Sequence, residues 1–284
     1  MEITICSKPL LFTGETVRFA EGGGRYAALR WTMAPYAPAG AAAAELGGSF
    51  PEDLLLAERF LAPAEIARFR SLFRNPRRQR ELLHTRLLAK RLIRDYVEER
   101  RGWRVGHERD IALLQVERGD RQGMPYISIG GERADPELSV SLAHGGHMLG
   151  AAVGERCLVG IDIEQIRPVE QGLPGLFLVP EERQWMSEVF RRYAADEWCL
   201  LMWSLKEAAG KALGTGFSCG FSSLRFHALE NGEGACRVRL DLNGGLERHA
   251  PRPRPRGVMY YDVRDGVCGV VCLLFSDQEG GSRD

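Results

Sequence analysis

The sequence predicts an α+β protein built of two α/β halves that join near Gly154. Two observations carry this prediction. Runs with strand and helix patterns follow one another in the order strand, helix, strands, and then strand, helix, helix, strands. The length of 284 residues is enough for one large domain or for two of ordinary size. No sequence repeat is evident, so the halves are predicted from element order alone, as residues 1–154 and 155–284.

The first half is expected to begin with two short strands, at Ile3–Leu11 and Tyr26–Trp31. Residues up to about 50 form an extension without a usable pattern, and its Ala-, Gly- and Pro-rich part, Ala34–Ser49, predicts a loop or a weak helix. Pro63–Phe73 predicts a helix, because proline is favoured in the first helical turn. Arg77–Arg100 predicts a longer helix, because its leucines fall on one stripe at helical spacing.

Four strands are expected in the middle of the chain. They lie at Pro125–Ile127, Leu138–Leu142, Met148–Val153 and Cys157–Glu164. The last of these alternates clearly, with apolar residues at the odd-numbered positions and both of its acids at even-numbered ones. Because successive side chains of a strand point to opposite faces, the two acids should share one face.

Two helices should follow in the second half. Pro180 is expected to open the first, which runs to about Tyr193. Asp196 is the expected N-cap of the second, which should end near Leu213, where Gly214 stops it.

The end of the chain predicts a β-hairpin. Its strands are Val258–Val263 and Val267–Phe275, joined across Asp265 and Gly266, a favoured pair for a two-residue turn. The preceding segment, Arg248–Arg256, is rich in proline and arginine and is expected to be an exposed linker.

Composition describes a globular protein without a strong overall charge. Hydrophobic residues make up 44% and charged residues 27%, and the net charge is zero, which excludes a general attraction to nucleic acid. The seven cysteines are scattered without a C-x-x-C pair, so neither a disulfide framework nor a zinc site is indicated. Neither a signal-peptide pattern nor a long apolar run is present, so we expect a cytoplasmic protein that makes no use of a membrane.

Basic residues concentrate in one region. From Arg68 to Arg104 there are thirteen basic residues against four acidic ones. Two interpretations remain open at this point. The region binds an anionic ligand or an acidic partner, or it is the solvated face of an arginine-rich helix.

Lysine is rare in this chain, with four lysines against thirty-four arginines. Two of the four, Lys206 and Lys211, lie five residues apart. Lysine is a compact, three-donor point charge suited to a phosphate, whereas arginine offers a planar fork. The placement of these two lysines therefore suggests contact with phosphate.

Asp162 and Glu164 are candidate metal ligands. They stand two residues apart at the end of an apolar strand, so their carboxylates can converge on one ion. Oxygen ligands without an accompanying His or Cys suit Mg²⁺ rather than zinc, and protein-bound Mg²⁺ is commonly shared with substrate phosphates. The alternative is a strand end with two solvated acids.

Glu207 and Lys211 stand four residues apart on the second helix of this half and share one of its faces. Taken alone, they are better explained as an ordinary helix-stabilising pair. The order of residues around them, and their distance from the two acids, makes a more specific pattern.

Two motifs taken together resemble a known family. Residues 160–164 read GIDIE, and residues 203–211 read WSLKEAAGK, about forty residues later. They resemble the G-[IV]-D-x-E and W-[ST]-x-K-E-[AS]-x-x-K motifs of the 4′-phosphopantetheinyl transferases, specifically the two-halved, single-chain Sfp-like type. More loosely, the resemblance extends from about Leu61 to Phe275.

The resemblance implies a fold of two similar α/β halves related by pseudo-twofold symmetry. It also implies a reaction, that of a holo-[carrier protein] synthase of the EC 2.7.8.7 type. The phosphopantetheine arm of coenzyme A is moved to a serine of an apo acyl or peptidyl carrier protein, with release of adenosine 3′,5′-bisphosphate. Such carriers serve fatty acid, polyketide or nonribosomal peptide biosynthesis.

The resemblance also assigns roles by position. Asp162, Glu164 and Glu207 would bind Mg²⁺, or Mn²⁺ in its place, against the diphosphate of coenzyme A. Lys206 and Lys211 would contact phosphate oxygens and offset the charge that develops as the bond to the bisphosphate breaks. Glu207, or a magnesium-bound water, would take the proton of the serine.

The nucleotide end of the implied pocket departs from the family pattern. Residues 123–125 read GMP where the family has G-K-P, so Met124 and Pro125 would adjoin the adenine without a lysine contact. Residues 143–145 read AHG where the family has S-H-S, which leaves His144 beside the 3′-phosphate. Without the family context, His144 would be interpreted as a core or turn histidine.

Arg86 and Lys90 lie on the basic helix, where the family tends to place cations near the nucleotide, and they complete the candidate coenzyme A contacts. We expect the coenzyme A cleft to lie between the halves, the acidic carrier protein to dock near the basic helix, and the protein to be a monomer.

Two other functions remain open. One is a different Mg²⁺-dependent enzyme that acts on a nucleotide phosphoester with the same acids. The other is a non-catalytic binding module whose basic helix binds an acidic protein or RNA. The absence of an RNA-binding signature with interleaved aromatic residues argues against RNA.

Overall fold

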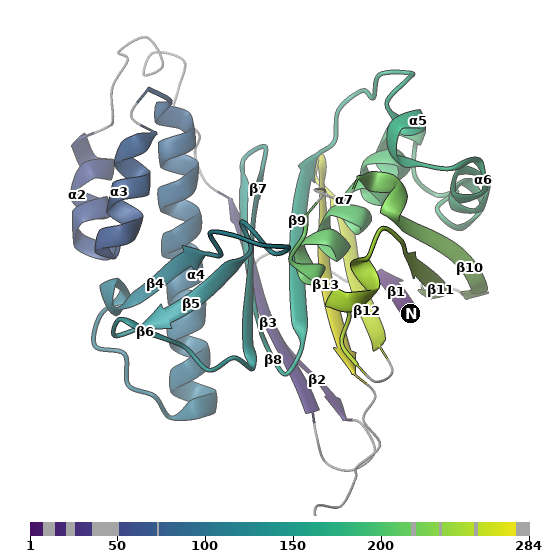
Figure 1. The fold of residues 1–284 in the computed structure, drawn as a ribbon. Helices are drawn as coiled ribbons and strands as arrows, with labels where there is room; N and C mark the ends of the chain where they lie inside the picture. The colour runs from purple at the N-terminus through teal and green to yellow at the C-terminus, as the bar shows by residue number, and fades with distance from the viewer. Residues whose placement is uncertain are drawn as a thin grey trace, which may run out of the picture.

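The structure, a computed structural model, describes residues 1–7, 15–20, 26–35, 51–72, 74–216, 220–232, 235–252 and 255–276 (Figure 1). Within these residues, runs of strands and runs of helices follow one another along the chain, and the strands form a six-stranded, a four-stranded and a three-stranded sheet. The predicted α+β class is therefore confirmed.

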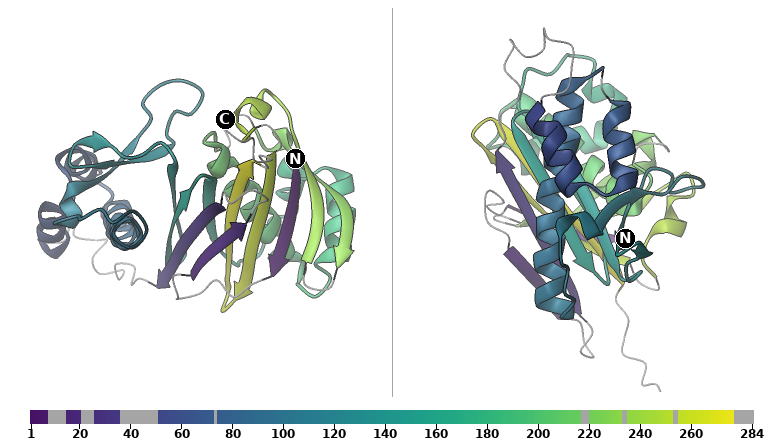
Figure 2. Two further views of the ribbon diagram at one scale, coloured as in Figure 1. Left: turned by 90° about the horizontal axis from the view of Figure 1, so that it is seen from below. Right: turned by 90° about the vertical axis from the view of Figure 1, so that its left-hand side faces the viewer.

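The six-stranded sheet contains most of the second half of the chain. Its strands, in spatial order, are β10 (Leu224–Gly232), β11 (Ala235–Leu242), β1 (Glu2–Ser7), β12 (Pro255–Arg264), β13 (Val267–Ser276) and β9 (Leu158–Gln165). Strands β1 and β12 pair in parallel, and the other neighbours pair antiparallel. Figure 2 shows β1 between the yellow strands and the green edge of the sheet. The first strand therefore lies in the sheet of the second half, although it belongs to residues 1–154.

Helices cover one face of this sheet and close its core. They are α5 (Pro174–Phe177), α6 (Pro180–Val189) and α7 (Ala195–Leu213). The hairpin between β12 and β13 is confirmed, with Asp265 and Gly266 at φ of 52° and 72°, as a two-residue turn of this kind requires.

The four-stranded sheet is antiparallel and belongs to the first half. Its order is β2 (Glu15–Ala20), β3 (Tyr26–Pro35), β8 (Met148–Glu155) and β7 (Leu138–Gly145). Helix α4 (Pro76–Arg101) packs on it through Ile93, Tyr96 and Val97, which are fully buried. The helix begins where the side chain of Asn75 accepts a hydrogen bond from the backbone N–H of Arg78.

A smaller layer also packs against α4. It consists of the helices α2 (Pro51–Phe60) and α3 (Pro63–Ser71) and the three-stranded sheet of β4 (Ile111–Gln115), β5 (Pro125–Ile129) and β6 (Glu132–Arg133). Ala57, Leu61, Phe69 and Leu83 form the core between the helices.

The two larger sheets share a core in the middle of the molecule. Trp31 of β3 stacks on Tyr260 of β12 with ring centroids 6.0 Å apart, and the apolar face of β9 packs into the same core. Only two residues separate β8 from β9, so the chain crosses from one sheet to the other there. Strand β9 consequently lies centrally, between α4 and α7 (Figure 1).

Several elements differ from the sequence prediction. Helix α2 and strands β4, β10 and β11 are present without having been predicted. The predicted linker Arg248–Arg256 is wrong in part, because a 3₁₀ turn spans Leu246–His249, the side chain of His249 is buried, and β12 begins at Pro255. Residues 8–11 of the first predicted strand and residues 36–49 of the predicted loop lie outside the described residues.

Two further observations concern the described ranges as a whole. No helix in them is both long enough and apolar enough to cross a bilayer. Six cysteines in these ranges carry free thiols, and Cys219 lies outside them.

Candidate active site

Strand β9 presents its acids to helix α7. Its odd-numbered apolar residues fill the core between the two sheets, so the even-numbered residues face the helix, as the alternation predicted. Gly160 permits an unusually close approach, because a Cβ at this position would lie 1.8 Å from the carbonyl oxygen of Ala208. Strand and helix therefore pack backbone against backbone two residues before Asp162.

The start of α7 differs from the prediction. The N-cap is Ala194 rather than Asp196, and the carboxylate of Glu197 accepts a hydrogen bond from the backbone N–H of Ala194 at 2.9 Å. Asp196 instead accepts from the backbone N–H of Val169 at 3.0 Å, which ties the segment after β9 to the helix. The predicted end at Gly214 is confirmed.

Lys211 lies between the acids of both elements. Its Nζ donates to Asp162 Oδ1 at 2.8 Å and to the carbonyl oxygen of Ile161 at 3.1 Å, and it lies 3.7 Å from Glu207 Oε1. Burial lowers the pKa of the Lys211 ammonium, but Asp162 and Glu207 outweigh burial and raise it overall. Lys211 is therefore firmly protonated.

The carboxylates of the cluster repel one another. Burial, and after it Asp162 and Glu207, raises the pKa of Glu164 to about 7. Burial and Asp162 also raise the pKa of Glu207, against the opposing effect of Lys211. An added cation would relieve this repulsion.

One oxygen of Asp162 has no partner. The residue is only 4% exposed, and within the described part of the chain its Oδ2 accepts no hydrogen bond. Because an unpaired buried carboxylate oxygen is costly, this atom fits a bound cation. No ready-made group of three or more His, Cys, Asp or Glu side chains able to hold a metal occurs in the described ranges. Lys211 stands between Asp162 and Glu207 instead.

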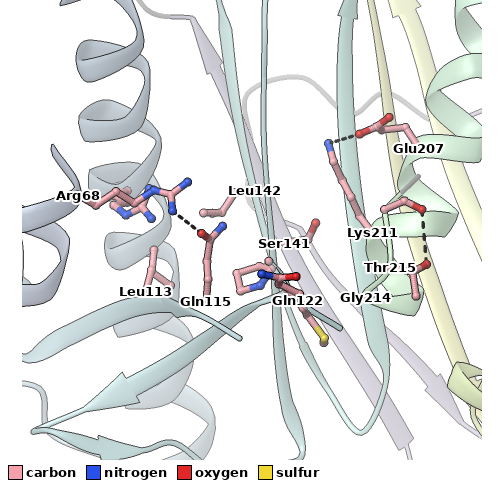
Figure 3. A pocket seen from close by; sticks show the side chains of 15 residues that line it. Arg68, Leu113, Gln115, Gln122, Ser141, Leu142, Glu207, Lys211, Gly214 and Thr215 are labelled. Atoms are coloured by element: carbon pink, nitrogen blue, oxygen red, sulfur yellow. Dashed lines mark hydrogen bonds and ion pairs between the residues drawn. The ribbon is translucent and has the colours of Figure 1, made fainter. Parts of the chain in front are cut away.

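A cavity of about 340 Å³ adjoins this cluster. Residues of α7 and of the turn after it line one wall, and residues of the first half line the other. Figure 3 shows Arg68 and Gln115 facing Glu207 and Lys211 across the cavity. A cleft between the halves, as the sequence predicted, is thus present.

Two arginines connect this cavity with two others. Arg68 and Arg86 also line neighbouring cavities of about 690 Å³ and 770 Å³. Arg68 donates from Nη1 to Gln115 Oε1 at 2.6 Å, and Arg86 Nε lies 3.1 Å from Glu65 Oε1. Arg86 was a candidate from the sequence, whereas Arg68 and Gln115 were not, and their only sequence signal was the position of Arg68 at the start of the basic region.

His144 lies in the last of these cavities. Its side chain is 55% exposed, and Nε2 lies 3.5 Å from Glu81 Oε2, a carboxylate that also pairs with Arg77 at 2.9 Å. Partial burial lowers the pKa of His144, although Glu81 opposes this shift. The imidazole is therefore mostly neutral at neutral pH and offers a neutral donor or acceptor to a ligand.

Packing explains why Ala143 and Gly145, the neighbours of His144, depart from the family pattern. Ala143 is buried in the core between the sheets. A Cβ on Gly145 would lie 2.1 Å from the carbonyl oxygen of Ile163, so no larger residue fits where β7 crosses β9.

Met124 and Pro125 line the same cavity as Lys211. A Cβ on Gly214 would lie 2.5 Å from Met124 Sδ, which shows that Met124 packs against the end of α7. The position that is lysine in the family pattern thus makes an apolar contact across the cleft.

Lys206 does not reach the cavity. Its side chain is fully buried, and Nζ donates to Glu182 Oε2 at 2.8 Å and to the carbonyl oxygen of Phe177 at 2.6 Å. The phosphate contact implied for Lys206 is therefore replaced by an interior ion pair, because the ammonium is inaccessible to a ligand.

Lys90 is also buried in an interior ion pair. It is fully buried, with Nζ 2.6 Å from Glu65 Oε2 and donating to the carbonyl oxygen of Phe60 at 2.9 Å. Of the two basic-helix candidates, only Arg86 lines the cavities.

Comparison with known proteins agrees with the motifs. Residues 158–253 match the sequence model of the 4′-phosphopantetheinyl transferase superfamily, a segment that includes β9, α6 and α7. The 4′-phosphopantetheinyl transferase psf-1 of Bacillus pumilus is 34% identical over 107 residues, which are 37% of this chain and 45% of that protein. The similarity thus spans less than half of that relative's length. Both motifs lie within the matched segment, where the structure pairs Asp162 of the first with Lys211 of the second, and this segment is similar to the 4′-phosphopantetheinyl transferase superfamily.

Proposed function

We propose that the protein transfers the 4′-phosphopantetheine group of coenzyme A to a serine of an apo acyl or peptidyl carrier protein and releases adenosine 3′,5′-bisphosphate. One observation carries the proposal. Glu207 and Lys211 of the matched segment and Arg68 and Arg86 of the other half line one cavity. Basic groups from two walls therefore surround a space beside a cluster of acids.

The three adjoining cavities suit a long ligand with several phosphates. Their volumes of about 340, 690 and 770 Å³ are of the size usual for small-molecule sites. Arg68 and Arg86 stand where the cavities meet and offer guanidinium groups to phosphate oxygens. We assign the diphosphate to the neighbourhood of Lys211.

The remaining lining residues suggest where the adenosine part of coenzyme A binds. Met124 and Pro125 offer an apolar surface for the adenine, and His144 adjoins the cavity assigned to the 3′-phosphate. Arg77 and Arg78 line the cavity of His144 and add positive charge that the sequence analysis had not singled out. They compensate for the missing lysine at position 124.

The transfer joins the serine oxygen to the phosphorus that carries the pantetheine arm. The bond from that phosphorus to the oxygen of the leaving bisphosphate breaks. Glu207 is our candidate to accept the serine proton, because burial and Asp162 raise its pKa. Lys211 remains charged and offsets the negative charge that develops on the leaving phosphate.

Asp162, Glu164 and Glu207 are the residues that would hold Mg²⁺, or Mn²⁺ in its place. The unpartnered Oδ2 of Asp162 and the raised pKa of Glu164 both fit a divalent cation. Such an ion, when bound, would polarise the diphosphate and neutralise part of its charge.

The carrier protein is expected to be acidic and to dock near the first turns of α4, where Arg77 and Arg78 lie. We further propose that the protein acts as a cytoplasmic monomer, since one chain supplies both walls of the cavity.

Mass spectrometry of the carrier tests this proposal. The protein is incubated with coenzyme A, Mg²⁺ and an apo carrier, and the carrier is expected to gain the mass of one phosphopantetheine group. Adenosine 3′,5′-bisphosphate should appear in equal amount. A carrier whose acceptor serine is replaced by alanine is the control, and the absence of any gain across acyl and peptidyl carriers would contradict the proposal.

A further inference from the structure

The two buried lysines belong to one arrangement that occurs twice. Residues 60–65 read FLAPAE, and residues 177–182 read FLVPEE. The chain therefore contains a short repeat that the sequence analysis did not recognise. In both copies the proline opens a helix and the final glutamate lies in its first turn, at Glu65 in α3 and at Glu182 in α6.

In the second copy, the carboxylate of Glu182 joins three segments. Oε2 accepts from the backbone N–H of Val179 at 3.1 Å and from the ammonium of Lys206 at 2.8 Å. Oε1 accepts from the backbone N–H of Phe226 in β10 at 2.9 Å. Lys206 completes the arrangement by donating to the carbonyl oxygen of Phe177.

In the first copy, Glu65 makes the same contacts. Oε2 accepts from the backbone N–H of Ala62 at 3.0 Å and lies 2.6 Å from the ammonium of Lys90. Oε1 accepts from the backbone N–H of Leu113 in β4 at 3.3 Å. Lys90 donates to the carbonyl oxygen of Phe60.

The two copies differ in the residue that lies one helical turn before the lysine. In the first, Glu65 Oε1 also lies 3.1 Å from Arg86, one helical turn before Lys90. The position one turn before Lys206 is Met202, which is buried in the core. In the second copy, the groups facing the cavity come after the lysine on α7.

We propose that Glu182 and Glu65 are positioning residues, each of which fixes the helix that forms one wall of the cavity. Glu182 fixes α7 through Lys206 and thereby sets the place of Glu207 and Lys211. Glu65 fixes α4 and orients Arg86 directly. The inference rests on the proposed function, since it assigns turnover to the wall formed by α7 and coenzyme A binding to the wall formed by α4.

Because these residues are buried, their contacts restrict the positions of the segments that they join. Glu65, Lys90, Glu182 and Lys206 are each no more than 2% exposed. Neither carboxylate can exchange a lost protein partner for water, so each fixes the position of the segments that it joins. The compact ammonium of lysine reaches a carboxylate and a carbonyl together, which explains why a chain so rich in arginine keeps lysine at these two positions.

Paired replacements test the inference by removing each buried lysine together with its carboxylate, so that no buried ammonium is left uncompensated. Glu182→Gln with Lys206→Met should lower kcat roughly 10- to 100-fold, because small displacements of reacting groups have effects of that order. The Kd of coenzyme A should change by less than about threefold in this variant, since Arg68 and Arg86 stay in place.

Glu65→Gln with Lys90→Met is the matched variant of the first copy. It should raise the Kd of coenzyme A roughly tenfold, which is about 1.4 kcal/mol, because Arg86 loses the carboxylate that orients it. Its kcat should stay within about threefold of the original value, because α7 keeps its own anchor.

Amide hydrogen exchange gives a readout that does not depend on turnover. The Glu182 and Lys206 replacements should accelerate exchange at Val179 and Phe226. The Glu65 and Lys90 replacements should accelerate it at Ala62 and Leu113. If either pair does not fold, Glu182→Asp and Glu65→Asp keep the charge, shorten its reach and carry the same expectations.

Two results would overturn the inference. In one, both pairs change the same constant. In the other, kcat per folded molecule and Kd stay at their original values and only the folded fraction falls. An unmodified protein that transfers nothing to any carrier would count against the proposed function instead, and the coenzyme A affinity and amide exchange would then still decide whether each glutamate positions its own wall.

Discussion

Lys211 donates a hydrogen bond to Asp162 Oδ1 at 2.8 Å, while the other carboxylate oxygen of Asp162 is buried and accepts none from the residues that the structure describes. This pair joins the strand that carries one motif to the helix that carries the other. Burial and then Asp162 raise the pKa of both Glu164 and Glu207, although Lys211 opposes both shifts, so one ammonium does not balance the acids. The cluster therefore favours a further cation.

Mg²⁺ should stabilise the folded protein through Asp162. At a concentration of about 100 times its Kd, an ion that binds only the folded state adds about 2.7 kcal/mol. Urea unfolding with and without Mg²⁺ measures this difference, and Asp162→Asn should abolish it. Asp241→Asn, at a partly exposed acid on β11 that pairs with Arg239, is the matched control and should keep the effect. Equal stabilisation of the original protein and Asp162→Asn would contradict the metal assignment.

Gly160→Ala should separate β9 from α7. A Cβ at this position would meet the carbonyl oxygen of Ala208 at 1.8 Å and the backbone nitrogen of Ala212 at 2.9 Å, so the helix must shift. We expect a loss of about 3 kcal/mol, at the upper end for overpacked sites, measured by urea unfolding. Gly172→Ala has open space around its Cβ and should be nearly neutral. A Gly160→Ala protein as stable as Gly172→Ala would show that the close packing is not required.

Arg68→Gln should weaken coenzyme A binding. Arg68 lines all three adjoining cavities, and a hydrogen bond to a charged group contributes about 1.5–3 kcal/mol, so the Kd should rise at least about tenfold. Titration calorimetry measures this change. Arg70→Gln, on the same helix and paired with Glu58 at the surface, is the control and should bind normally. Equal affinities of the two variants would place the phosphates elsewhere.

His249 should make stability fall on acidification. Burial, followed by Arg121 and Arg248, lowers the pKa of its imidazole, against a weaker opposing effect of Asp120. The unfolded chain then takes up the proton more readily than the folded protein, so stability is kept above the ordinary value of 6.5 and declines as the pH falls below it. His249→Gln should flatten this decline, as measured by urea unfolding between about pH 7.5 and about pH 5.5. An unchanged slope would remove His249 as its source.

Helices with a clear apolar stripe were predictable, and strands that depend on distant partners were not. The helix from Pro76 to Arg101 and the hairpin at Asp265 follow from local spacing. Strands β10 and β11 carry polar residues such as Arg237 and Arg239 on their exposed faces, and β11 pairs with β1 from the other end of the chain. Helix α2 exposes Leu54 and Leu55 to solvent, which blurs its helical pattern.

The acids and Lys211 of the site were predictable because each lies at a fixed spacing within one strand or one helix. Arg68 and Gln115 meet only through tertiary packing, so nothing in the local sequence predicts their pairing. Lys206 was assigned to phosphate because lysine is rare here and from its place in the motif, and Lys90 was placed near the nucleotide by the resemblance. A buried ion pair, however, needs a compact ammonium as much as a phosphate does. The pattern that separates the two uses is the repeated FLxPxE segment, which supplies the carboxylate.

The most direct test follows the carrier protein by mass with two variants of the same helix. The original protein, with coenzyme A and Mg²⁺, should convert an apo carrier to its holo form and release one adenosine 3′,5′-bisphosphate for each carrier. Glu207→Gln should be slower by roughly 100-fold or more, as expected when a general base is lost, while Glu197→Gln, at the far end of α7, should be close to the original. No mass gain with any acyl or peptidyl carrier, or an undiminished rate for Glu207→Gln, would contradict this account.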